Sequence, residues 1–230
     1  SKAGFNASLA LDSSDNPCIA YYETVGKDLK LARRNGSLWN RETISAGANN
    51  SKYPSLAMDG SNLPRVAWNE ADDHSLRYAE KPLFTWNTRT VVDSHVGQYV
   101  SLALDVSDNP RIAYYDDGSR DLTYVTRSGP TWNTPATVDS AGDGGKVASP
   151  ALDGSGNPRI AYYDATNKDL KYAAWNGSWT TETVDSPGDV GQYASLALDG
   201  AGNPRIAYYD ATNKDLKYAA WNGTSWDIET

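Results

Sequence analysis

Two sets of residues recur along this chain and have the chemistry to hold a sugar. The first set consists of acids spaced 46 to 48 residues apart: Glu23, Glu70, Asp116, Asp164 and Asp210. The second set consists of tyrosines and glutamines: Tyr53, Tyr99, Tyr193, Gln98 and Gln192. Aromatic rings stack on the apolar faces of sugars, while carboxylates and amides hydrogen-bond to their hydroxyls. We therefore take these ten residues as the predicted ligand-binding residues.

The same acids could instead serve catalysis or merely cap their own turns. A glycosidase needs two carboxylates in different environments, and nearly equivalent acids provide neither an obvious acid nor an obvious base. One segment breaks the symmetry, because residues 68–74 read Trp-Asn-Glu-Ala-Asp-Asp-His where other copies read Tyr-Tyr-Asp. Whether the loop with Asp72, Asp73 and His74 is functional stays open. We predict no catalytic residue.

Composition excludes several classes of protein. The chain has 230 residues, a formal net charge of −8 and a single cysteine, so no internal disulfide is possible. Cys18, His74 and His95 together supply only three zinc ligands. Acidic charge without basic clusters argues against nucleic acid, and no apolar run approaches the ~20 residues that span a bilayer. We expect no metal and no cofactor.

An internal repeat organises the whole chain. Pro17, Pro64, Pro110, Pro158 and Pro204 lie 47, 46, 48 and 46 residues apart, and each follows a segment of the type SLALD. Residues 153–177 and 199–223 differ at one of 25 positions. The repeat predicts five units of one supersecondary structure. Their expected ranges are 8–54, 55–100, 101–148, 149–194 and 195–230.

Each unit contains four short runs typical of β-strands, separated by turn signals. In the fourth unit these runs are 149–153, 159–163, 170–175 and 179–184, and an Asn-Gly hairpin signal precedes the last. No stretch has a useful helical period. Four antiparallel strands per repeat predict an all-β, five-bladed β-propeller in a single domain. Each blade is complete in sequence order, so we expect closure blade by blade without a swapped strand.

Most repeated aromatic and charged residues are expected to serve structure. Trp39, Trp86, Trp132, Trp179 and Trp226 begin the fourth run of each unit, where we expect them to pack between sheets. The aspartates that end each SLALD segment should cap the following turn. The arginines that begin the second run, such as Arg159, are also expected to be structural. The predicted ligand-binding residues lie elsewhere, in the loops after the second and fourth runs.

The unit SLALDGSGNPRIAYYDATNKDLKYAAWNGSW resembles the short-blade extracellular β-propeller repeats of bacteria and archaea. In its period and number of copies the chain is similar to five-bladed lectins of the tachylectin-2 type. That resemblance implies a propeller fold and sugar binding, although the sugar-contacting residues of those lectins do not match this chain one by one. The Asp-Gly turns also resemble the Asp-box of sialidase-like propellers, with tryptophan at a different place.

These observations lead to one functional expectation with two alternatives. We expect a non-catalytic, lectin-like module that binds carbohydrate at repeated sites, with a glycan or a surface protein as its partner. The alternatives are a protein-interaction scaffold and a glycan-active hydrolase or lyase. The resemblance implies an extracellular or cell-surface location. The chain begins at Ser1 without a signal peptide, which indicates a mature or excised segment. Oligomeric state is not predicted.

Overall fold

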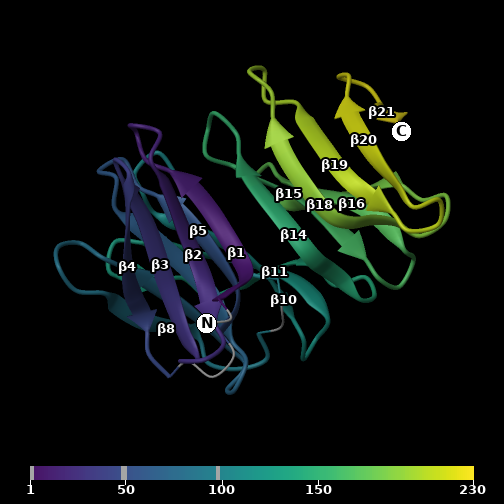
Figure 1. The fold of residues 1–230 in the computed structure, drawn as a ribbon. Helices are drawn as coiled ribbons and strands as arrows, with labels where there is room; N and C mark the ends of the chain where they lie inside the picture. Colours follow the sequence, from purple (N-terminus) through teal and green to yellow (C-terminus); the bar gives the residue numbers. More distant parts are fainter. Residues whose placement is uncertain (1–2, 48–50, 97–98) are drawn as a thin grey trace. The chain divides into compact units, whose positions relative to one another are not determined.

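The structure is a computed structural model and describes residues 3–47, 51–96 and 99–230. Its described elements are all β-strands (Figure 1). The chain divides into two compact units, residues 1–108 and 109–230. No helix in the described part of the chain is long and apolar enough to cross a membrane.

The first unit holds two complete four-stranded antiparallel sheets and one further strand. The first sheet has the order β1-β2-β3-β4 and the second has the order β5-β6-β7-β8. The strands are β1 (Ala3–Leu11), β2 (Pro17–Glu23), β3 (Asp28–Asn35), β4 (Leu38–Ser45), β5 (Ser51–Met58), β6 (Pro64–Glu70), β7 (Ser75–Glu80), β8 (Asn87–Val92) and β9 (Ser101–Leu104).

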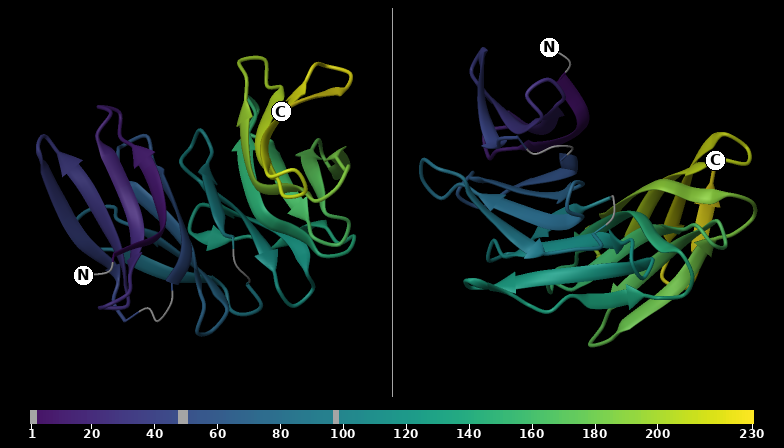
Figure 2. Two further views of the ribbon diagram at one scale, coloured as in Figure 1. Left: turned by 45° about the vertical axis from the view of Figure 1, so that its right-hand side comes forward. Right: turned by 90° about the horizontal axis from the view of Figure 1, so that it is seen from below.

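The second unit repeats this pattern. The fourth and fifth sheets have the orders β14-β15-β16-β17 and β18-β19-β20-β21, and their strands lie side by side in Figure 2. The third sheet contains β10, β11, β12 and β13 of this unit. The strands are β10 (Pro110–Asp116), β11 (Asp121–Ser128), β12 (Thr131–Trp132), β13 (Ala136–Asp139), β14 (Gly144–Leu152), β15 (Pro158–Asp164), β16 (Asp169–Trp175), β17 (Trp179–Asp185), β18 (Val190–Leu198), β19 (Pro204–Asp210), β20 (Asp215–Trp221) and β21 (Trp226–Glu229).

Local hydrogen bonds explain why each strand ends where the repeat predicts a turn. In the first sheet Asp12 Oδ1 accepts hydrogen bonds from the backbone N–H groups of Ser14 (3.0 Å) and Asn16 (2.9 Å). Asp153 Oδ1 does the same in the fourth sheet with the N–H groups of Ser155 and Asn157. The expectation that these aspartates cap turns is confirmed, and the proline that follows begins the next strand.

The first strand of a sheet is longer than expected. Strand β14 begins at Gly144 rather than at Ser149, and its pairing with β15 shifts register at two places. Strand β18 behaves in the same way. Gln192 and Tyr193 therefore lie within a bulged strand and not in a loop, which corrects the predicted position of these two residues. Tyr53 likewise lies within β5.

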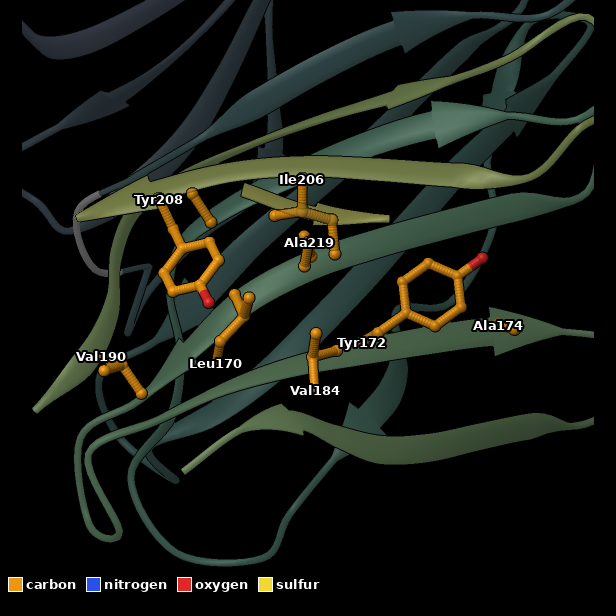
Figure 3. Packing of buried hydrophobic residues seen from close by; sticks show 10 residues of the cluster. Leu170, Tyr172, Ala174, Val184, Val190, Ile206, Tyr208 and Ala219 are labelled. Carbon is orange, nitrogen blue, oxygen red and sulfur yellow. The ribbon is translucent and has the colours of Figure 1, made fainter. Parts of the chain in front are cut away.

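Apolar side chains fill the space between adjacent sheets within each unit. Leu170, Tyr172 and Val184 of the fourth sheet pack against Ile206 and Tyr208 of the fifth (Figure 3). Other clusters join the first sheet to the second and the third to the fourth. Because side chains alternate along a strand, each strand of an inner sheet supplies buried residues to both of its faces.

Candidate functional site

The predicted acids all lie at the ends of second strands, where most of them cap turns. Asp164 Oδ1 accepts hydrogen bonds from the N–H groups of Thr166 (2.9 Å) and Asn167 (3.2 Å). Asp210 has the equivalent bonds, and backbone donation from Asn213 lowers the pKa of its carboxyl. Both aspartates are only 1% exposed, so their carboxylates are committed to their own turns.

The remaining acids are more varied. Asp116 Oδ1 accepts hydrogen bonds from the N–H groups of Gly118 (2.9 Å) and Ser119 (3.1 Å). Glu23 forms an ion pair with Lys30, with Oε2 and Nζ 2.6 Å apart. Glu70 lines a cavity of about 300 Å³ in the first unit, together with Asp72 and other residues. Glu70 belongs to the asymmetric segment of the second sheet, residues 68–74.

The predicted tyrosines and glutamines have different surroundings. The rings of Tyr53 and Tyr99 lie 4.9 Å apart and inclined by 44°, and both side chains are half-buried. Tyr193 is 68% exposed. Gln192 Nε2 donates a hydrogen bond to Asp189 Oδ1 at 3.0 Å. Gln98 lies outside the described residues.

A polar cluster that the sequence did not indicate surrounds Gln192. Tyr163 donates its hydroxyl proton to Asp189 Oδ1 at 2.8 Å, and the N–H of Asp189 donates to Thr212 Oγ1 at 2.7 Å. Burial and the neighbouring Asp189 carboxylate raise the pKa of Tyr163 to about 12. Tyr115, Asp143 and Thr166 repeat these contacts in the preceding pair of sheets. The cluster satisfies its own hydrogen bonds, which favours a structural role.

The loop of the second sheet places its acidic and histidine side chains at the surface. Asp72, Asp73 and His74 are exposed, and Asp73 accepts a hydrogen bond from Arg77 Nη2 at 2.6 Å. His95 Nδ1 lies 3.0 Å from Ser94 Oγ. Among residues 3–47, 51–96 and 99–230, no three His, Cys, Asp or Glu side chains gather in a group that could hold a metal ion.

Two equivalent grooves lie at the opposite ends of the strands in the second unit. Groove 3/4, between the third and fourth sheets, has a volume of about 360 Å³, and groove 4/5, between the fourth and fifth sheets, has about 450 Å³. The two grooves use matching repeat positions. Groove 3/4 is lined by Arg111, Tyr124, Ala136, Asn157, Trp175 and Trp179. Groove 4/5 is lined by Arg159, Tyr172, Glu182, Asn203, Trp221 and Trp226.

Three aromatic rings in each groove are held in a repeated edge-to-face arrangement. In groove 4/5 the ring of Trp226 lies 5.5 Å from Tyr172 and 5.5 Å from Trp221. In groove 3/4 the ring of Trp179 lies 5.5 Å from Tyr124 and 5.4 Å from Trp175. All four tryptophans are half-buried. Because neighbouring rings fix each other, the tryptophans keep accessible surface in one orientation.

Polar groups complete groove 4/5. Arg159 Nη2 donates hydrogen bonds to Asp153 Oδ2 at 2.9 Å and to Asn176 Oδ1 at 3.1 Å, so the guanidinium is held in place. Within the described part of the chain, the buried indole N–H of Trp226 has no hydrogen-bond partner. A buried donor without a partner costs about 1–3 kcal/mol, and the buried position of this N–H keeps it from contacting a ligand in the groove. The groove therefore combines an aromatic wall with an arginine held in place.

The first unit lacks this arrangement between its two complete sheets. Cys18 stands at the position of Arg159, and Lys81 stands at the position of Trp175 and Trp221. Lys81 Nζ forms an ion pair with Glu42 and lies 6.0 Å from the centre of the Trp86 ring. A long cationic side chain thus occupies the space that stays open in the second unit.

Sequence reasoning correctly assigned packing roles to Trp179 and Trp226, but it did not identify the grooves. Both tryptophans contact the hydrophobic clusters between sheets, as predicted. Trp175 and Trp221, which end the third strands before the hairpin, were not singled out. Their recurrence beside a hairpin turn was the available signal, because a large apolar residue at a strand end remains accessible unless another sheet covers it.

Solved structures similar in fold to this chain include a polysaccharide lyase, a fucose-recognising lectin and a galactanase. An ulvan lyase of a polysaccharide lyase family matches 99% of this chain and 74% of its own, with a TM-score of 0.69 and 13% identity. The fucose-binding lectin of Aleuria aurantia is a six-bladed β-propeller. Its match covers 99% of this chain and 78% of the lectin chain, with a TM-score of 0.64 and 18% identity. The match to an exo-β-1,3-galactanase from Phanerochaete chrysosporium covers 98% of this chain and 62% of the galactanase chain, with a TM-score of 0.60 and 9% identity.

No family model matches the chain, and no curated protein matches it. At such low identities the solved structures show the fold alone. The chain is an all-β protein whose five antiparallel sheets have the arrangement of β-propeller blades. This confirms the predicted propeller class and its four-stranded repeat.

Proposed function

We propose that this chain is a non-catalytic module that binds carbohydrate at repeated sites, and that it acts outside the cell or at a cell surface. The observation that carries the proposal is the pair of equivalent grooves in the second unit. Each offers tryptophan faces for the apolar side of a sugar ring beside an arginine and an asparagine for its hydroxyls. Sites of this composition suit ligands that are apolar on one face and polar around the edge.

The carboxylates around the grooves favour binding over hydrolysis. Glycoside hydrolysis generally uses two carboxyl groups on either side of the bond that breaks. Glu182 is the one carboxylate among the described residues that line groove 4/5, and groove 3/4 is lined by none. The lyase and the galactanase nevertheless share this fold, so an enzyme is the second candidate. Release of new reducing ends or unsaturated sugars from a polysaccharide would favour that candidate.

A glycan array probed with matched variants tests the binding proposal. We expect Trp175→Ala and Trp221→Ala each to weaken binding to the preferred glycan about tenfold, because each removes one stacking face. Phe84→Ala is the control, since Phe84 is 90% exposed and is not among the residues that line either groove. Unchanged binding by the Trp175→Ala/Trp221→Ala double variant would exclude the grooves as the site.

A second set of variants on the same glycan array tests the ligand-binding residues that were predicted from the sequence. Gln192→Ala and Tyr193→Ala alter the other ends of the strands, where Tyr193 is the most exposed of the predicted aromatic residues. If these two substitutions abolish glycan binding while the tryptophan variants retain it, the site lies at that end. Absence of binding to every glycan at high protein density would instead support the alternative of a scaffold for surface proteins.

We also propose that the five sheets form a closed ring, as the five-fold repeat predicts. The supporting observation is an apolar face at each end of the series of sheets. Leu216 of the fifth sheet is 74% exposed, whereas the equivalent Leu170 and Leu122 are fully buried. Leu9 of the first sheet is 62% exposed, whereas the equivalent Leu56 is 7% exposed. Burial of such faces is the driving force by which blades pack.

A further inference from the structure

Grooves 3/4 and 4/5 have matching linings but differ by one charge. The difference lies on the fourth strand, at the residue paired with the groove tyrosine. Tyr172 pairs with Glu182 across β16 and β17, whereas Tyr124 pairs with Ala136 across β11 and β13. Arginine is present in both grooves, as Arg159 and Arg111. Groove 4/5 therefore carries a carboxylate at a position where groove 3/4 carries a methyl group.

The contacts of Glu42 show which way a carboxylate at this position reaches. Glu42 is the equivalent residue of the first sheet, where it pairs with Leu31 across β3 and β4. Its Oε2 forms an ion pair with Lys81 of the second sheet. Lys81 occupies the position of Trp221 in the fifth sheet. A carboxylate here thus spans the space between two sheets and binds a positively charged group inside it.

Glu182 is directed toward the same space. It lines groove 4/5, and its charge acts on the Tyr172 phenol together with that of Arg159. A negatively charged ligand group beside Arg159 would also lie near Glu182 and would be repelled by it. The same group beside Arg111 meets Ala136, with no acid among the residues that line groove 3/4. Near a protein surface, like charges a few ångströms apart repel with an energy of a few kcal/mol or less.

We propose that this position selects the charge of the sugar that each groove accepts. Groove 3/4 takes a sugar that carries a carboxylate, such as a uronic acid, and groove 4/5 takes a neutral sugar. The inference rests on the proposed binding function and adds a ligand class for each groove.

Indole N–H signals in nuclear magnetic resonance spectra of the whole chain report on the two grooves separately. Methyl β-glucuronide and methyl β-glucoside are suitable probes because they differ only in the carboxylate. We expect the glucuronide to shift the signals of Trp175 and Trp179 at about five- to tenfold lower concentration than those of Trp221 and Trp226. The preference should weaken at high salt, because the charges lie near solvent.

Substitutions at the selecting position provide the decisive comparison. Glu182→Ala should make groove 4/5 accept the glucuronide, and Ala136→Glu should make groove 3/4 reject it. Glu182→Gln keeps the shape of the side chain and should behave like Glu182→Ala, since the charge is what differs. If all variants bind both sugars equally in both grooves, the inference is wrong while the binding function stands. If neither sugar shifts any indole signal, the inference is wrong, and absence of binding across the glycan array is what would overturn the proposed function.

Discussion

At the scale of single residues, the most consequential groups that the sequence did not reveal are two buried clusters. Asp139 at the end of β13 accepts a hydrogen bond from the Tyr162 hydroxyl at 2.5 Å and pairs with Lys171. Asp185, Tyr208 and Lys217 repeat the arrangement between the fourth and fifth sheets. Each cluster links the outer strand of one sheet to the middle strands of the next, at the point where an unpaired charge would be costly.

Asp139→Asn should destabilise the protein by about 3–5 kcal/mol at pH 7, because it leaves the Lys171 ammonium buried without its partner. Burial alone would raise the pKa of Asp139, but hydrogen bonds from Lys171 and Tyr162 outweigh it and lower the pKa. The ionised carboxylate therefore stabilises the fold above the unfolded pKa of about 3.9, and this contribution is lost as the pH falls through the lower folded value.

Urea unfolding at pH 7 and at pH 3 measures both parts of this prediction. The difference between the native chain and Asp139→Asn should be large at pH 7 and should shrink on acidification. Asp15→Asn is the control, because Asp15 is exposed and has a left-handed φ of 60° that asparagine tolerates. An Asp139→Asn variant as stable as the native chain at pH 7 would show that the buried pair contributes nothing.

At the scale of the elements, a residue with a left-handed backbone near the start of the first strand recurs in all five repeats, and in the first, second, fourth and fifth sheets it accompanies a bulge. Asn6, Tyr53, Tyr99, Val147 and Tyr193 have positive φ angles between 49° and 70°. The left-handed region is unfavourable for residues other than glycine, and it is least favourable for β-branched residues. Val147, with a φ of 53°, is the one β-branched residue of the five. The bulge is therefore imposed by sheet packing rather than by local preference.

Val147→Asn should stabilise the protein by roughly 1 kcal/mol, which raises the melting temperature by about 2–4 °C. Asparagine adopts the left-handed region more readily, and Asn6 already occupies this position in the first sheet. Calorimetric melting measures the effect. Val106→Asn serves for comparison, because Val106 is 97% exposed and does not have a positive φ. Equal effects of the two substitutions would mean that Val147 carries no strain.

Comparison of the strands with the repeat shows which elements could be predicted from the sequence. The second strands, the third strands and the aspartate-capped turns were predicted closely. The alternation of buried and exposed side chains determines the strands, and short-range hydrogen bonds determine the turns. The outer strand of the third sheet was not: it is divided into β12 and β13. Pro130 and Pro135 flank these pieces and lack the N–H that a continuous strand would need.

At the scale of the whole molecule, ring closure can be tested with one reactive thiol. Cys18 is fully buried, and burial raises the pKa of its thiol to about 11, so it should not react. A cysteine introduced by Leu216→Cys should then report whether the face of the fifth sheet is covered. We expect slow labelling by a maleimide, since the equivalent leucines of the other sheets are buried.

Ser155→Cys gives the rate for an open position, because Ser155 lies in an exposed turn. If Leu216→Cys reacts as fast as Ser155→Cys in the folded protein, the fifth sheet is uncovered and the ring is open. Slow labelling at every protein concentration indicates closure within one chain. Slow labelling only at high concentration would assign the cover to a second copy and would contradict closure.

The repeat, the four strand-forming runs of each unit and the turns between them could be predicted from the sequence alone. These features depend on interactions within about 25 residues, and near-identical copies must make them alike. The tertiary structure alone decided which repeated residues remain available to a ligand. The carboxylates of Asp164 and Asp210 accept hydrogen bonds from the N–H groups of their own turns, whereas Trp175 and Trp221 keep an accessible face. Accessibility depends on how the next sheet packs, and no single repeat contains that information.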